Sequence, residues 1–186
     1  SKIKNLKLTG KIGNDDYKVM RDEMPRLANL NLKEVESRVV IKRYEVRENI
    51  RIEVGERECY AIPANAFEKK KSLVRVVFPD RLEEIGTGAF FLCENLTGSL
   101  IFPEGLKRIG SIAFKECSNL TGRLYLPTTL VSIGDDGYSG GAPYHTGAFV
   151  GCPLTGELVL PSKLEYIGSG TFAWCHELRG EIRIPE

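Results

Sequence analysis

A repeat of about 24 residues constrains the fold of this chain more than any other feature of its sequence. Four complete units begin at proline residues, at Pro79, Pro103, Pro127 and Pro161. Their shared template is P-x-x-L-x-x-I-G-x-x-A-F-x-x-C-x-x-L-T-G-x-L-x-L, and a partial earlier unit begins at Ile62 with Lys70 in the cysteine position. An insertion over residues 135–147 lengthens the last interval to 34 residues. Self-similarity at such a period predicts a stacked, solenoid-type protein.

The repeated columns predict a core shared between units. Leucine and isoleucine columns predict two inward ladders: Leu82, Leu106, Leu130 and Leu164, and Ile85, Ile109, Ile133 and Ile167. The phenylalanine column predicts an aromatic stack of Phe67, Phe90, Phe114, Phe149 and Phe172. Glycine after each isoleucine suits a turn with positive φ or a close approach by the next coil. Since one unit buries too little apolar surface to offset the entropy of ordering its backbone, the units must stack.

Residues 1–36 predict a different coil, which caps the solenoid and contains one helix. Asn14 or Asp15 is expected to supply the helix N-cap, and the helix should run to about Met24 before Pro25 stops it. The L-x-x-L-x-L run that follows is the strand pattern of a leucine-rich repeat.

Residues 37–60 are highly charged and alternate in hydropathy, so we expect a hairpin inserted between the cap and the repeats. Residues 61–186 then form a single continuous run of repeats. The predicted fold class is α/β and strand-rich: a right-handed, horseshoe-like leucine-rich-repeat solenoid with an N-terminal cap coil.

Composition limits the partners. The chain has 186 residues and a formal net charge of +1, which argues against a nucleic-acid binder that neutralises many phosphates. No apolar run approaches the ~20 residues of a membrane-spanning helix. The sequence stops at Glu186, where another coil would begin, so we expect an open edge that allows edge-to-edge self-association.

Four of the five cysteines occupy one column of the repeat: Cys93, Cys117, Cys152 and Cys175. Stacked coils place these thiols in a line, whereas a Cys₄ metal site needs them to converge on one point. Parallel Cβ vectors also disfavour disulfides between neighbouring coils. We therefore expect buried, reduced thiols and no metal, with a disulfide as the alternative. Cys59 lies outside the column and is the better candidate for a reactive or pairing thiol, although burial as an inert thiol is favoured there too.

An outward column on the short strands is the first candidate binding surface. Val77, Ile101, Tyr125 and Val159 should align as an exposed apolar stripe, flanked by charged residues that include Arg123 and Arg183. Solenoids present such extended faces to partners. The structural alternative is that β-branched and aromatic residues here stabilise neighbouring strands by cross-strand packing.

The insertion is the second candidate. Its Tyr138, Tyr144 and His145, together with Ser and Gly, form an adaptable composition that resembles antibody recognition loops. Asp135 and Asp136 are carboxylates that could bind Ca²⁺, but their spacing matches no EF-hand loop. A tolerated surface bulge is the favoured structural alternative.

The template also resembles the BspA-type leucine-rich repeats of bacterial surface proteins, through I-G-x-x-A-F-x-x-C and L-T-G-x-L-x-L-P. Its departures are the insertion, Lys70 in the cysteine column and Thr171 in place of alanine. The resemblance implies an extracellular or outer-surface protein, often with a lipid anchor upstream of this chain, that binds host or matrix partners without catalysis.

Sequence motifs for catalysis are absent. The two histidines, His145 and His176, lie in different coils, and no P-loop, G-x-G-x-x-G or H-E-x-x-H occurs. We therefore predict no enzyme, no catalytic residue and no cofactor. The predicted function is a surface adhesion module for a protein or glycan partner. The alternatives are a structural spacer within a larger surface protein and, less favoured, a glycan-active enzyme.

Overall fold

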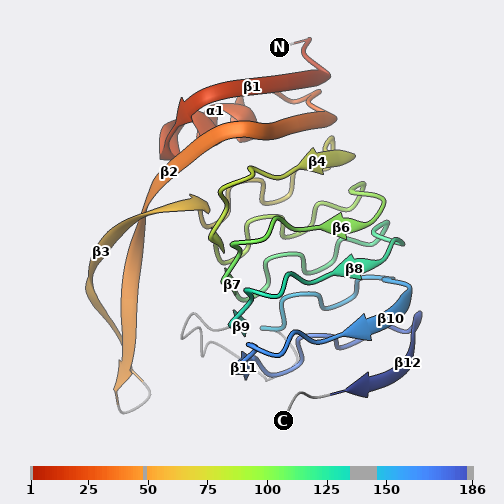
Figure 1. Ribbon diagram of the computed structural model, residues 1–186. Coiled ribbons are helices and arrows are strands. Elements are labelled where there is room, and N and C mark those ends of the chain that lie inside the picture. Colours follow the sequence, from red (N-terminus) through yellow and green to blue (C-terminus); the bar gives the residue numbers. More distant parts are fainter. Residues whose placement is uncertain (1, 48–49, 135–145, 184–186) are drawn as a thin grey trace.

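The computed structural model describes residues 2–47, 50–134 and 146–183, and its coils stack along one axis from the N-terminus to the C-terminus (Figure 1). The architecture is a strand-rich β-solenoid with one helix in the described part of the chain. The predicted solenoid with shared core is thus confirmed. One continuous cluster of buried apolar side chains extends from Tyr17 in the first coil to Cys175 in the last.

The N-terminal coil consists of β1 (Asn5–Ile12), α1 (Asn14–Asp22) and the first part of β2 (Asn29–Arg47), and β1 pairs in parallel with β2. The predicted N-cap is wrong, because Gly13 holds that position. The Asp16 carboxylate, three residues into the helix, accepts a hydrogen bond from the Gly13 backbone N–H at 2.9 Å and so caps the start of the helix. The Asn14 side chain instead bonds the backbone of Val40.

Strand β2 continues past the cap and becomes one arm of a hairpin, with β3 (Ile50–Ile62) as the other arm. The two arms pair antiparallel from Arg38 opposite Tyr60 outward. A buried hydrogen-bond chain fixes the base of the hairpin to the helix, because Ser37 accepts from Tyr17 and donates to the carbonyl of Ala61. Burial raises the pKa of Tyr17, so this phenol stays protonated.

Two columns of short parallel strands run along the solenoid. The first column is β5 (Glu84–Ile85), β7 (Arg108–Ile109), β9 (Ser132–Ile133) and β11 (Tyr166–Ile167), and it begins on the end of β3. The second column is β4 (Arg75–Val77), β6 (Leu100–Ile101), β8 (Leu124–Tyr125), β10 (Gly156–Val159) and β12 (Leu178–Arg183). In this second column β6 pairs with β8 and β10 pairs with β12, while β4 pairs with β2 of the N-terminal coil.

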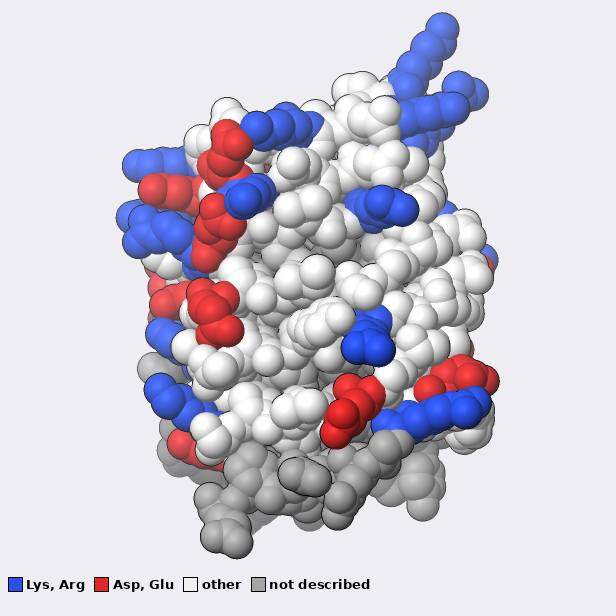
Figure 2. All heavy atoms as spheres, turned by 45° about the vertical axis from the view of Figure 1, so that its right-hand side comes forward, with Lys and Arg blue, Asp and Glu red and all other residues white. Residues whose placement is uncertain are grey.

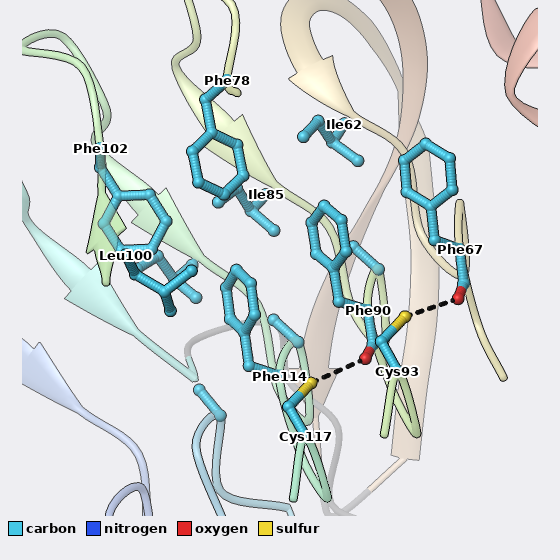
Figure 3. Close-up of a cluster of buried hydrophobic side chains, with 14 of the residues drawn as sticks. Ile62, Phe67, Phe78, Ile85, Phe90, Cys93, Leu100, Phe102, Phe114 and Cys117 are labelled. Carbon is cyan, nitrogen blue, oxygen red and sulfur yellow. Dashed lines mark hydrogen bonds between the residues drawn. The ribbon is translucent and has the colours of Figure 1, made fainter. Parts of the chain in front are cut away.

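The phenylalanine column is the centre of the core (Figure 3). Phe90 and Phe114 stack with ring centroids 5.0 Å apart, and Phe114 and Phe149 with centroids 5.3 Å apart, in nearly parallel planes. The backbone repeats the same contact, since the Phe67 N–H donates to Ala89 and the Phe90 N–H to Ala113. Each coil therefore supplies hydrogen-bond partners and apolar cover to the previous one.

The glycine column is explained by close approach. A Cβ built on Gly86 would lie 2.5 Å from the Ala64 nitrogen, and one on Gly110 would lie 2.6 Å from the Thr87 nitrogen. Neither glycine has positive φ, whereas Gly134 does, with φ 78°. A side chain in this column would push neighbouring coils apart.

Candidate binding surface

The outward column of the second set of strands forms an exposed apolar stripe. Its four members are between 44% and 67% exposed: Val77, Ile101, Tyr125 and Val159. Their strand neighbours Leu100, Leu124 and Leu158 point inward and are buried. Strand alternation thus gives β6, β8 and β10 one inward leucine and one outward apolar residue each, while in β4 the partly buried Val76 takes the inward position. Figure 2 shows this face with an uncharged band along its middle and most charged side chains along its edges.

A shallow depression lies in the middle of the stripe, beside the ends of β6 and β8. It has a volume of about 380 Å³ and is lined by Ser99, Ile101, Phe102, Glu104, Tyr125, Leu126 and Pro127. That size is near the lower end of small-ligand pockets, so the depression can hold one side chain or one ring rather than a larger ligand. Sequence reasoning identified Ile101 and Tyr125 but missed Glu104, which lies in the loop after β6.

The other predicted site residues are only partly placed. The outward residue Arg123 lies on the stripe face just before β8, and its backbone N–H donates to the Ser99 hydroxyl at 3.1 Å. The backbone of Arg183 pairs with Val159, and the side chain of Arg183 lies outside the described part. Three further residues, Tyr138, Tyr144 and His145, lie in the insertion and also fall outside the described residues.

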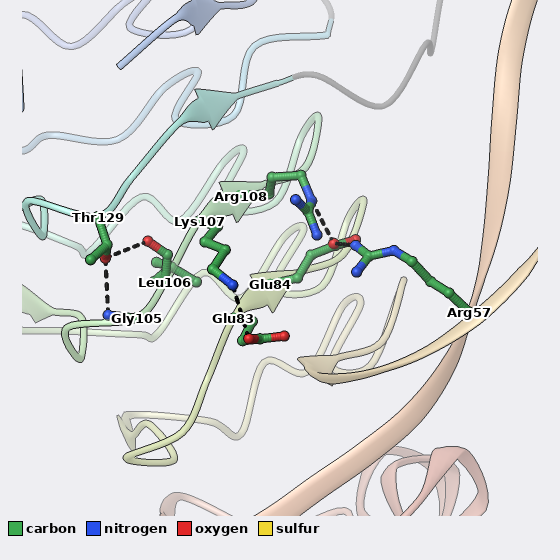
Figure 4. A network of polar contacts seen from close by, with 8 residues as sticks. All are labelled: Arg57, Glu83, Glu84, Gly105, Leu106, Lys107, Arg108 and Thr129. Carbon is green, nitrogen blue, oxygen red and sulfur yellow. Dashed lines mark hydrogen bonds and ion pairs between the residues drawn. The ribbon is translucent and has the colours of Figure 1, made fainter. Parts of the chain in front are cut away.

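The first strand column carries charge where the second is apolar (Figure 4). Lys107 of one coil pairs with Glu83 of the previous coil at 3.0 Å, and Arg108 pairs with Glu84 at 2.7 Å. Glu84 also pairs with Arg57 of the hairpin. The network therefore ties β3 to two successive coils, a link that the linear sequence does not reveal.

All five cysteines are free and buried. Burial raises the pKa of Cys59 to about 11 and the pKa values of Cys93 and Cys175 to about 12. These thiols are protonated at neutral pH, so Cys59 is as inert as the column cysteines. Within the described ranges, no group of three or more His, Cys, Asp or Glu residues could hold a metal ion.

The column thiols have a structural role that the sequence did not suggest. Each donates to the phenylalanine carbonyl of the preceding coil, with sulfur–oxygen distances of 2.9 to 3.2 Å, as for Cys93 and Cys117 in Figure 3. In the first unit Lys70 occupies this position and donates to the carbonyls of Arg21 and Met24, at and just after the end of α1. Burial lowers the pKa of Lys70. The column therefore serves as a row of hydrogen-bond donors between coils.

The last coil departs from the predicted inward ladder. Ile167 is 40% exposed, whereas Ile85, Ile109 and Ile133 in the same column are fully buried. Tyr166 and Trp174 of this coil are also exposed. The reason is geometric, because among the described residues no following coil covers β11.

Solved structures of bacterial leucine-rich-repeat proteins resemble this fold. A T. pallidum leucine-rich-repeat protein matches with a TM-score of 0.51 and 35% identity, over 67% of this chain and 52% of that one. A protein from Bacteroides ovatus ATCC 8483 matches with a TM-score of 0.56 and 27% identity, over 78% of this chain and 33% of that one. The chain thus spans about half and about a third of these relatives.

No helix in the described ranges is long and apolar enough to cross a bilayer.

Sequence comparison identifies the family. No curated protein sequence matches the chain. The pattern described as the BspA type leucine rich repeat region matches six copies over residues 51–141 and 144–186. These matched segments cover most of the chain, so the chain belongs to the BspA-type leucine-rich-repeat family.

Proposed function

We propose that this chain is a non-enzymatic binding module of the bacterial surface, and that the apolar stripe contacts a protein or glycan partner. The exposed side chains of Val77, Ile101, Tyr125 and Val159 carry the proposal. Aligned apolar side chains that stay exposed on neighbouring strands are typical of a surface that a partner covers. Family membership supports a surface interaction role and a non-catalytic repeat.

The surroundings of the stripe support binding. Arg123 lies on the stripe face, and we propose that Arg183 and the insertion residues Tyr138, Tyr144 and His145, whose side chains lie outside the described part, also contact the partner. Interfaces commonly combine an apolar, aromatic centre with a polar rim. We place Tyr125 at the centre, because it is the aromatic member of the stripe and lines the depression.

The test is an array of glycans and matrix proteins probed with the wild-type chain, Tyr125→Ala and Val19→Ala. Val19 lies on α1, is similarly exposed and makes a matched control for loss of surface apolar atoms. We expect Tyr125→Ala to weaken binding of the partner by about tenfold or more, as at a central aromatic contact, and Val19→Ala to leave it unchanged. An array without any ligand, or a Tyr125→Ala variant identical to wild type, would favour a structural spacer.

Self-association through the exposed edge of β11 is part of the same proposal. Ile167 and Tyr166 leave apolar surface on β11, which pairs with β9 alone among the strands that the structure describes. Sedimentation velocity should show a mass that rises with concentration, and Ile167→Lys should keep the chain monomeric. A wild-type chain that stays monomeric at all concentrations rules out this contact.

A further inference from the structure

The depression in the stripe has a chemical character that narrows its ligand. Five of its seven lining residues are apolar or aromatic: Ile101, Phe102, Tyr125, Leu126 and Pro127. Ser99 and Glu104 are the polar members, and no described Lys or Arg is part of the lining. The site therefore combines an apolar wall with a single negative charge.

Glu104 has no cationic partner among the described residues. The Thr128 hydroxyl donates a hydrogen bond to its Oε2 atom at 2.9 Å. In contrast, Glu83 and Glu84 on the other strand column are each paired with a cation. The Thr128 hydrogen bond orients the carboxylate, and within the described ranges its Oε1 atom has no hydrogen-bond donor, so it can accept one from a ligand.

Arg123 lies close to the stripe but is directed toward the next coil. A Cβ built on Gly156 of β10 would lie 3.1 Å from the Arg123 Nε atom, so the arginine side chain packs over that glycine. Gly156 lacks a side chain there, which leaves room for this arrangement. Arg123 therefore does not fill the depression beside β6.

We propose that the depression receives a lysine or arginine side chain from a partner protein, an inference that rests on the proposed binding role of the stripe. The methylene groups of such a side chain pack on Ile101, because long cationic residues bury their stems on apolar surface. The charged head group pairs with the Glu104 carboxylate. The ring of Tyr125, which also lines the depression, adds a cation–π attraction. A purely apolar ligand would leave the carboxylate unpaired.

The test uses small probes whose only difference is the head group. Backbone amide chemical shifts of the wild-type chain are followed by NMR during titration with Nα-acetyl-lysine-N-methylamide, with the arginine analogue and with Nα-acetyl-norleucine-N-methylamide. We expect saturable shifts at Ile101, Glu104 and Tyr125 with the two cationic probes, and an affinity for norleucine that is lower by up to about fivefold, the upper end for an exposed ion pair.

Two matched variants assign the effect to one carboxylate. Glu104→Gln should reduce the affinity for the lysine probe by about fivefold, whereas Glu157→Gln, an exposed carboxylate on β10 of the same face, should leave it unchanged. The unchanged amide spectrum of each variant away from the substitution shows that the fold is retained. Equal affinity for norleucine and lysine, or saturable shifts with methyl glycosides in place of the cations, overturns the proposal.

The outcome separates this proposal from the proposed function. A protein partner that is lost in Tyr125→Ala but bound normally by Glu104→Gln leaves the binding role standing and removes the cationic ligand. Probe binding that depends on Glu104, in a chain that finds no array partner, removes the adhesion role and leaves the cation site.

Discussion

Two apolar columns of this solenoid share one period but face opposite directions. The phenylalanine column has the same residue in all five coils, and four of its rings are fully buried. The stripe has valine, isoleucine, tyrosine and valine in successive coils, all of them exposed. A stacked core requires one shape at every level, whereas an outward position accepts any strand-forming side chain. The stripe can therefore vary its chemistry from coil to coil without changing the fold.

The largest difference between the columns should appear in stability. Phe114→Ala removes a fully buried ring between Phe90 and Phe149 and should lower the free energy of unfolding by about 3–5 kcal/mol. Tyr125→Ala removes a similar ring from the surface and should cost under about 1 kcal/mol. Urea denaturation followed by circular dichroism measures both, and similar losses in the two variants would contradict the division into core and stripe.

The buried thiols should also make the free energy of unfolding depend on pH, whereas the stripe residues should not. The pKa of Cys93 is raised to about 12 in the folded chain, against about 8.5 in an unfolded one. The raised value means that the thiol's contribution is complete below about pH 8.5 and is lost as pH rises toward about 12. Between pH 7 and pH 10 this thiol alone should remove about 2 kcal/mol of stability.

Cys93→Ala tests this pH dependence. Between pH 7 and pH 10 the free energy of unfolding should fall by about 2 kcal/mol less in Cys93→Ala than in the wild type. Ile101→Thr on the stripe should keep the wild-type pH profile. Parallel pH profiles for Cys93→Ala and the wild type would show that this thiol does not carry the effect.

The sequence could predict both columns, because each depends only on the period and on strand alternation. Phe114 and Ile101 were assigned inward and outward from those two rules, and their burial agrees. The two rules fail where burial depends on a coil that the repeat pattern does not guarantee. Ile167 obeys the ladder in sequence yet is exposed, since burial there depends on a following coil.

Polar partners were the least predictable part. The role of Lys70 depends on carbonyls 46 and 49 residues away, and that of Cys93 on a carbonyl 26 residues away. Glu104 has no counterpart in the apolar pattern, so only the folded surface places it beside Ile101 and Tyr125. Pattern analysis identifies apolar columns, while hydrogen-bond partners across coils become visible only in three dimensions.

Lys70 occupies the cysteine position in the first unit, next to the cap, and its ammonium group takes the place of the thiol donor. Lys70→Met keeps the stem but leaves the carbonyls of Arg21 and Met24 without their ammonium donor, so we expect a loss of about 1–2 kcal/mol. Lys69→Met, one residue earlier and exposed, should change stability by under about 0.5 kcal/mol. Equal effects of the two substitutions in thermal denaturation would show that the buried donor is dispensable.

The smallest expected effect is the one that decides why the stripe is apolar. If Ile101 serves cross-strand packing, Ile101→Ala should cost up to about 1 kcal/mol and Ile101→Thr much less, because threonine keeps the β-branch. If Ile101 instead serves a partner, both variants should stay within about 0.5 kcal/mol of the wild type and both should bind the partner more weakly. Denaturation midpoints and binding titrations on the same two proteins separate these cases, since strand packing predicts a difference between alanine and threonine that partner contact does not.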